Sequence, residues 1–71
     1  MNKEILFKHV EKAENKWLDS LKDIDTEFSR GIVSERTRFE NAKAYAVISA
    51  LDDVMEEYGI TDEYIEWKEK K

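Results

Sequence analysis

Apolar residues recur at helical spacing along the first 30 residues of the chain. They are separated by three or four residues, which places their side chains on one face of an α-helix. Asn2 stands before this stretch and suits the N-cap, and Gly31 follows it and suits the left-handed position that ends many helices. The pattern predicts a helix over about residues 3–30. Its apolar stripe consists of Leu6, Val10, Ala13, Trp17, Leu21, Ile24 and Phe28.

A second stretch with the same periodicity lies between Ser34 and Gly59. Ser34 is a favoured N-cap residue, and Glu35 places a negative charge at the positive end of the helix dipole. Gly59 again suits the position after the last helical turn. The pattern predicts a helix over about residues 35–58. Its apolar face consists of Ala44, Val47, Ile48, Leu51, Val54, Met55 and Tyr58.

The remaining residues predict a short third helix over about residues 62–69. Thr61 is interpreted as its N-cap, because a threonine hydroxyl can accept a hydrogen bond from a free backbone N–H of the first turn. Ile60 and Ile65 are spaced to pack together across the start of the helix as a hydrophobic staple. We expect this helix either to dock on the rest of the chain or to serve as a segment that a partner recognises in a groove.

The link between the two long helices is only about three residues, Gly31-Ile32-Val33. A link this short makes consecutive helices antiparallel neighbours. The sequence therefore predicts an all-α fold in a single domain, residues 1–71. We expect an antiparallel helical hairpin (about 3–30 and 35–58) followed by the short C-terminal helix.

Pairing across the turn follows from this arrangement. Residues whose numbers add up to about 64 should face one another, which places Val10 against the region of Val54 and Met55. By the same rule Phe28 should lie near Thr37. These pairs predict a continuous apolar seam from one end of the hairpin to the other.

A two-helix hairpin leaves half of each core side chain exposed to water. The third helix is too short to cover a seam of about 40 Å, the length given by a rise of about 1.5 Å per residue. The second long helix also carries a further apolar set, Phe39, Ala42, Ala46 and Ala50. We therefore expect a homodimer that forms a four-helix bundle, since two-fold symmetry is the commonest arrangement. The alternative is that these residues widen the core within one chain.

Composition and charge narrow the function classes. The chain has 71 residues with 12 Lys and Arg, 17 Asp and Glu, no Cys and a net charge of −5. The absence of cysteine excludes disulfides, thiolate metal sites and a cysteine nucleophile. Net negative charge argues against direct binding to nucleic acid or to acidic membranes, and no apolar run approaches the ~20 residues that span a bilayer. We expect a cytoplasmic protein that contacts neither.

Acidic residues are concentrated near the C-terminus, with no basic residue among them. These are Asp52, Asp53, Glu56, Glu57, Asp62, Glu63 and Glu66. Asp52 and Glu56 are like charges at helical i, i+4 spacing, which is unfavourable. They also fall at the end of a helix, where the dipole disfavours negative charge. Residues that violate local preferences twice invite a functional explanation.

Three interpretations of this acidic segment are open. The first is pairing across the hairpin, with Lys8 near Glu56, Lys12 near Asp52, and Lys3 and His9 close by. The second is a surface that binds a basic protein, for example a DNA-binding protein that meets the acids in place of phosphates. The third is binding of a divalent metal ion by carboxylates.

The third interpretation has a specific form. Glu11-x-x-Glu14 and Asp53-x-x-Glu56 resemble the carboxylate pairs with which all-α nucleotide pyrophosphatases of the MazG-like kind hold Mg²⁺. In that family the pairs read E-x-x-E and E-x-x-D. The second pair stands here in the opposite order, and the family's additional acid next to the first pair is absent. The resemblance implies a Mg²⁺-dependent nucleotide hydrolase as a further alternative.

Two other segments are candidates for partner contact. Arg36, Arg38 and Phe39 form an arginine–aromatic group just after the turn, a combination that is enriched in interface hot spots. Tyr64 and Trp67 belong to the acidic–aromatic segment of the C-terminal helix. A single histidine, with no cysteine and no second histidine, does not make a zinc site, and we expect no cofactor.

No arrangement of residues indicates catalysis. We therefore expect a small acidic regulator or inhibitor, not an enzyme, that binds a protein partner by occupying its surface. The alternatives are a structural subunit whose role is homo-oligomerisation and the Mg²⁺-dependent hydrolase. The candidate partner-binding residues are Asp52, Asp53, Glu56, Glu57, Asp62, Glu63, Tyr64, Trp67, Phe39, Arg36 and Arg38.

Overall fold

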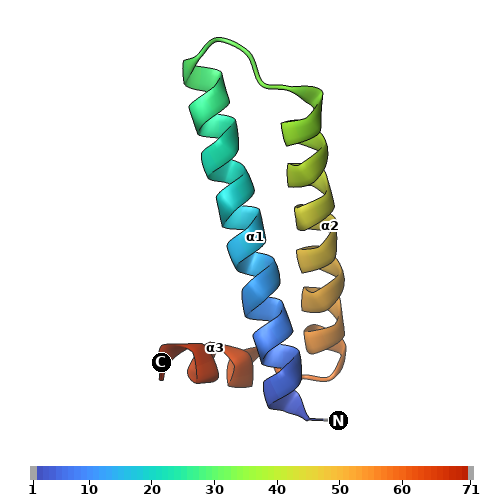
Figure 1. Ribbon diagram of the computed structural model, residues 1–71. Coiled ribbons are helices and arrows are strands. Elements are labelled where there is room, and N and C mark those ends of the chain that lie inside the picture. The colour runs from blue at the N-terminus through green and yellow to red at the C-terminus, as the bar shows by residue number, and fades with distance from the viewer. Residues whose placement is uncertain (1, 71) are drawn as a thin grey trace.

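The chain folds into three α-helices in the computed structural model, which describes residues 2–70. They are α1 (Lys3–Ser29), α2 (Glu35–Glu57) and α3 (Thr61–Glu69). The long helices α1 and α2 run antiparallel, and α3 crosses the end of the hairpin opposite the turn (Figure 1). The all-α prediction is confirmed, and each boundary lies within one residue of its predicted position.

The predicted N-caps of the two long helices are confirmed. The side-chain oxygen of Asn2 accepts a hydrogen bond of 2.9 Å from the backbone N–H of Glu4. The hydroxyl oxygen of Ser34 accepts one of 3.2 Å from the backbone N–H of Thr37. Each bond satisfies a backbone donor that the first turn of a helix leaves unpaired.

Both long helices end in the same backbone motif. Gly31 and Gly59 adopt the positive φ angles of +103° and +67° that side chains disfavour. The backbone N–H of the residue after each glycine then bonds back to the last turn. Ile32 donates to the carbonyl of Glu27 at 3.3 Å, and Ile60 donates to that of Met55 at 2.9 Å. This pattern is the Schellman motif, in which glycine is the favoured residue.

The start of α3 differs from the prediction. Thr61 is the first residue of the helix and not its N-cap; Ile60 occupies the cap position without a side-chain hydrogen bond. The predicted staple is also wrong, since Ile60 is buried while Ile65 is about half exposed. The reason is the preceding Schellman motif, which turns Ile60 inward against Met55. The chain therefore enters α3 directly, with no residue free to cap it.

The core lies at the end of the hairpin that α3 covers. Its buried side chains are Phe7, Val10, Met55, Ile60 and Tyr64, with Leu6, Leu51 and Trp67 packed against them. The ring of Phe7 lies 5.4 Å from that of Tyr64 and 5.7 Å from that of Trp67, centroid to centroid. Docking of the C-terminal helix on its own hairpin is thus confirmed, as is the predicted meeting of Val10 with Met55.

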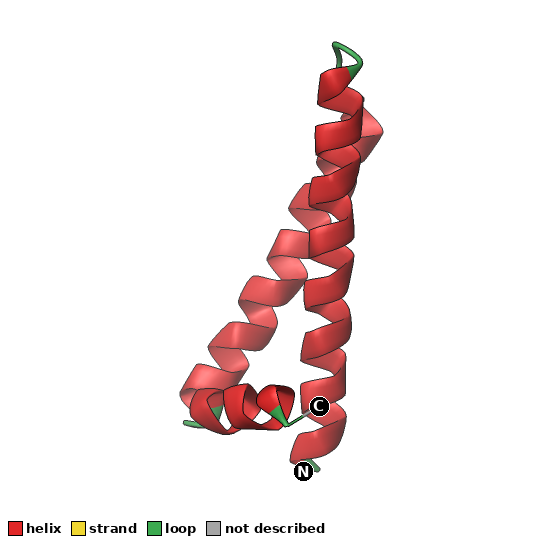
Figure 2. Ribbon diagram, turned by 90° about the vertical axis from the view of Figure 1, so that its left-hand side faces the viewer, coloured by secondary structure: helices red, strands yellow, loops and turns green. Residues whose placement is uncertain are grey.

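Toward the turn the contacts between α1 and α2 become polar. The amide of Asn41 donates to the hydroxyl of Ser20 at 2.9 Å. The carboxylate of Glu27 accepts hydrogen bonds from the hydroxyl of Thr37 and from the backbone N–H of Ser34, the latter at 2.8 Å. The axes of the two helices are inclined to one another: their ends next to the turn lie apart in Figure 1, and their opposite ends lie apart in Figure 2.

The predicted apolar stripe of α1 is wrong in its second half. Leu21 is 36% exposed and Phe28 75% exposed, while Ser20 is buried and Glu27 takes the predicted place of Phe28 beside Thr37. Alternating steps of three and four residues keep a stripe facing a neighbouring helix, whereas two successive steps of four turn it outward. The steps from Ala13 to Trp17 and from Trp17 to Leu21 are two such steps of four, so the stripe leaves the face toward α2 beyond this point.

Two members of the predicted apolar face of α2, Val47 and Tyr58, are likewise exposed.

In the part of the chain that the structure describes, no helix combines the length and the apolar character needed to cross a bilayer.

Candidate functional site

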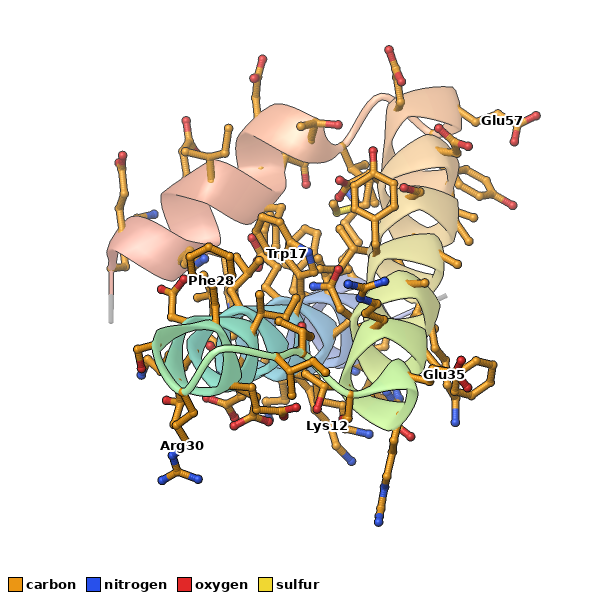
Figure 3. The ribbon with its side chains drawn as sticks, turned by 90° about the horizontal axis from the view of Figure 1, so that it is seen from above. Lys12, Trp17, Phe28, Arg30, Glu35 and Glu57 are labelled. Atoms are coloured by element: carbon orange, nitrogen blue, oxygen red, sulfur yellow. The ribbon has the colours of Figure 1, made fainter. Side chains whose placement is uncertain are left out.

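The predicted acidic residues occupy the last two turns of α2 and the whole of α3. All seven are exposed in the structure: Asp52, Asp53, Glu56, Glu57, Asp62, Glu63 and Glu66. The side chain of Glu57 points away from the hairpin (Figure 3). We call this set the acidic end of the molecule.

The predicted pairing of the acidic segment with cations of α1 is confirmed for Lys3, which pairs with Glu63, and is wrong for Lys8 and Lys12. Lys8 lies 3.7 Å from Glu4 on its own helix, and within residues 2–70 neither Lys8 nor Lys12 forms an ion pair with α2. Lys12 lies on the side of α1 away from α3 (Figure 3), while Asp52 lines a hollow beside α3. Lys12 lines the groove on the other face of the hairpin, so Lys12 and Asp52 lie on different faces and do not meet across the seam.

Only one residue of the acidic end has a cationic partner among the residues that the structure describes. The ammonium group of Lys3 lies 2.9 Å from the carboxylate of Glu63. Burial, together with the negative charges of Glu14, Asp53 and Glu56, raises the pKa of Asp52 above its ordinary value. The folded chain thus holds these carboxylates together against their mutual repulsion.

A hollow of about 540 Å³ opens between α2 and α3 within the acidic end. Asp52 and Glu56 stand at its polar side, and Met55 and Tyr64 supply buried apolar surface beneath them. A lysine or arginine side chain combines an apolar stem with a cationic head. The hollow therefore has the chemistry to receive such a side chain.

A polar cluster that the sequence did not reveal fastens α3 to α1. The hydroxyl of Tyr64 donates to the carboxylate of Glu14, and the ammonium group of Lys68 lies 3.2 Å from the same oxygen. Burial, the hydrogen bond to Glu14 and the negative charges of Glu11 and Asp52 raise the pKa of the Tyr64 hydroxyl. The only sequence signal was the i, i+4 spacing of Tyr64 and Lys68, which puts both on one face of α3.

The carboxylates of the hydrolase-like pattern are not gathered into a metal centre. Glu14 is engaged by Tyr64 and Lys68, and Asp53 is exposed on α2. Among residues 2–70 there is no group of three or more histidine, aspartate or glutamate side chains placed to hold a metal ion.

The predicted aromatic contacts fall into two groups. Tyr64 is buried and Trp67 half-buried, and both are used in the packing of α3 on Phe7. Phe39 is 66% exposed in the first turns of α2, near the exposed Arg36 and Arg38. Of the predicted aromatic residues, Phe39 is thus the one free to meet a partner.

A groove of about 690 Å³ follows the seam between α1 and α2 on the face away from α3. Its floor contains Ala13, Ala44 and Leu51. Its walls carry charges of both signs, among them Lys12, Lys16, Lys43, Asp19, Asp23 and Glu40. The balance of charges gives this groove no preference for an ion of either sign.

A second exposed surface is apolar. Leu18, Leu21 and Phe28 of α1 and Tyr45 of α2 are all exposed large side chains, and we call this set the apolar shelf. Phe28 projects from α1 on the side toward α3 (Figure 3). Leu21 and Phe28 were predicted to lie in the hairpin core, and in the structure both lie at the surface.

Comparisons of this chain with protein-family models, with curated proteins and with solved structures found no match. A functional interpretation therefore rests on the surfaces just described.

Proposed function

We propose that the protein is a small non-enzymatic module that binds a basic surface on another protein through its acidic end and acts as a regulator or inhibitor by occupying that surface. The observation that carries this proposal is the lack of cations at the acidic end. Among residues 2–70, Lys3 is the one cation that forms an ion pair there.

The energetics of the isolated chain favour such a partner. Like charges at i, i+4 spacing cost a few tenths of a kcal/mol each, and the helix dipole adds a similar cost at the end of α2. A cationic partner would relieve both. Exposed charges of one sign also steer an oppositely charged protein and raise its rate of association.

The hollow beside Asp52 adds selectivity to this attraction. A carboxylate whose pKa is raised by burial and by its neighbours gains more from a cation than a fully solvated one does. A lysine or arginine of the partner can lay its stem against Met55 and reach Asp52 or Glu56. The preferred partner surface therefore carries projecting basic side chains.

Calorimetric titration with an oligo-arginine peptide tests the proposal. The double variant Asp53→Asn/Glu57→Gln removes two exposed charges that take no part in the core, and should weaken binding by about tenfold at low salt. The matched control is Glu35→Gln/Glu40→Gln, which removes two acids from the other end of α2 and should leave the affinity nearly unchanged. Equal affinity of wild type and both variants would refute the acidic end as the binding surface.

A second candidate function is self-association, and the shape of the chain favours it. The chain exposes 5660 Å² of surface, whereas a compact monomer of 8.4 kDa exposes about 4,600 Å². Its radius of gyration is 14.4 Å, against about 11 Å for a compact chain of this length. The excess surface is about what one subunit buries in a standard interface, ~800 Å². We propose a homodimer in which two hairpins form a four-helix bundle.

A further inference from the structure

We infer that the apolar shelf is the surface on which a second copy of the chain docks, with the two copies antiparallel about a two-fold axis. The turn end of each hairpin then meets the acidic end of the other. This inference rests on the proposal of self-association and adds the surface and the orientation.

The contribution of α1 to this surface follows from its contacts with α3. Glu14 bonds to Tyr64 and Lys68, so its side of α1 faces α3. Leu18, Leu21 and Phe28 follow Glu14 by four, seven and fourteen residues, spacings that keep them on the same face of a helix. These three side chains therefore lie on the same face of α1 as the contacts with α3, but nearer the turn than α3 reaches. The described part of the chain leaves them exposed.

The contribution of α2 is a row of three residues. Asp52 lines the hollow beside α3, and Tyr45 and Arg38 precede it by seven and fourteen residues. Seven residues are close to two helical turns, a rise of about 10 Å. The row thus runs from a cation near the turn, through an exposed aromatic ring, to an anion at the acidic end.

This row is complementary to itself only in one orientation. A two-fold axis beside Tyr45, perpendicular to the helices, places Arg38 of each copy against Asp52 of the other. Such an interface is isologous, and each favourable pair occurs twice. A parallel arrangement would place Arg38 against Arg38 and Asp52 against Asp52, which like-charge repulsion disfavours.

The other surfaces are less suited to a second copy. The groove on the opposite face is walled by charged side chains. The predicted face with Phe39, Ala42, Ala46 and Ala50 offers one large apolar side chain, against four on the apolar shelf. Burial of apolar area is the main source of association energy, so the apolar shelf is the stronger interface.

Sedimentation equilibrium of single variants tests the surface. Tyr45→Glu places two acids beside the proposed axis and should weaken the dimer at least about tenfold. Phe39→Glu is the matched control, since Phe39 is a similarly exposed aromatic residue on the same helix, and it should leave the dimer unchanged. Because both positions are exposed, circular dichroism should show the helix content of the wild type in each variant.

A charge exchange tests the orientation. Arg38→Glu and Asp52→Arg should each weaken the dimer, and the double variant should recover most of the loss because the opposite charges face each other again. Failure of the double variant to recover would overturn the antiparallel arrangement.

The remaining outcomes separate the proposals from one another. A dimer that breaks with Phe39→Glu but not with Tyr45→Glu would overturn this inference and leave self-association standing. A chain that stays monomeric at high micromolar concentration would overturn both. Neither result affects the acidic end as a partner surface, because its test uses Asp53 and Glu57.

Discussion

At the scale of single residues, the turn end of the hairpin is held by Glu27. Its carboxylate accepts hydrogen bonds from the hydroxyl of Thr37 and the backbone N–H of Ser34. These bonds, with the charge of Arg30, lower the pKa of Glu27. The residue thus joins the end of α1 to the beginning of α2 as long as it is ionised.

A glutamate whose pKa is lower in the folded state than in the unfolded state stabilises the fold at pH values above the unfolded pKa. This stabilisation is lost as the pH falls through the folded pKa. Glu27→Gln should therefore lower the thermal midpoint at neutral pH and have a smaller effect in acid. Melting curves of wild type and Glu27→Gln between neutral pH and pH ~3 measure this, with Asp25→Asn as the control. An effect that does not shrink toward acid would contradict this role of the carboxylate.

The stability that Tyr64 contributes should depend on pH in the alkaline range. Its pKa is raised by burial and by the bond to Glu14, so its contribution to stability is present below the unfolded pKa of about 10 and is lost as the pH rises above it. In the variant Tyr45→Phe/Tyr58→Phe, Tyr64 is the single tyrosine left. Its phenolate absorbance should then appear together with loss of helicity. Ionisation of Tyr64 near pH ~10 in a fully helical protein would contradict the raised pKa of its hydroxyl.

Removing the Tyr64 hydroxyl should also weaken the attachment of α3. Tyr64→Phe should cost about 1.5–3 kcal/mol at neutral pH, the usual contribution of a hydrogen bond to a charged group. Urea denaturation followed by circular dichroism measures this cost. The matched control is Tyr58→Phe, since Tyr58 is largely exposed. Equal stability of the two variants would show that the bond to Glu14 contributes nothing.

At the scale of elements, α3 depends on the hairpin. A helix of nine residues is not stable by itself, because nucleation consumes most of the energy of so few hydrogen bonds. Its aromatic side chains pack on Phe7, and Ile60 joins it to the end of α2. In turn α3 covers the apolar side chains of α1 and α2 at the end of the hairpin opposite the turn.

Phe7 is therefore central to the packing of α3 on the hairpin. Phe7→Ala should cost about 3–5 kcal/mol, the range for a buried aromatic residue, which is enough to unfold much of a domain of this size. Phe39→Ala provides the control and should stay within about 0.5 kcal/mol, as for other surface positions. Urea unfolding of both variants measures the difference, and similar midpoints would contradict the position of the core.

The ends of the two long helices could be predicted from the sequence because their signals are local. Asn2, Ser34, Gly31 and Gly59 act on backbone groups within a few residues of themselves, and each has the predicted role. The faces of the helices could not be predicted as well. Ser20 is buried because Asn41 provides its hydrogen bond, a partner that only the folded hairpin brings near.

The same distinction applies to the candidate site. That the acidic end is exposed was predicted from composition and spacing. Of its proposed cations Lys3, Lys8 and Lys12, Lys3 forms an ion pair there, with Glu63 of α3. Lys12 lies on another face of the hairpin. The position of α3 depends on contacts such as that of Phe7 with Tyr64, which join residues far apart in the chain.

At the scale of the whole molecule, shape and charge indicate a protein that acts through contact with other chains. The molecule measures 44 × 23 × 15 Å, and its core is confined to one end. The rest of the hairpin is a two-helix layer with large apolar side chains on its surface. Acids are concentrated near α3, whereas exposed arginines such as Arg38 lie near the turn, which suits both a basic partner and a second, antiparallel copy.

The central claim about shape is that this fold leaves surface for a second copy of the chain to cover, and the molar mass of the wild-type protein in solution tests it most directly. Sedimentation equilibrium at micromolar to high micromolar concentration should show a species of twice the chain mass of 8.4 kDa. The dimer should persist as salt is raised, because burial of apolar area is the main source of its association energy. A fully helical protein with the mass of a single chain at every concentration and salt would contradict the claim.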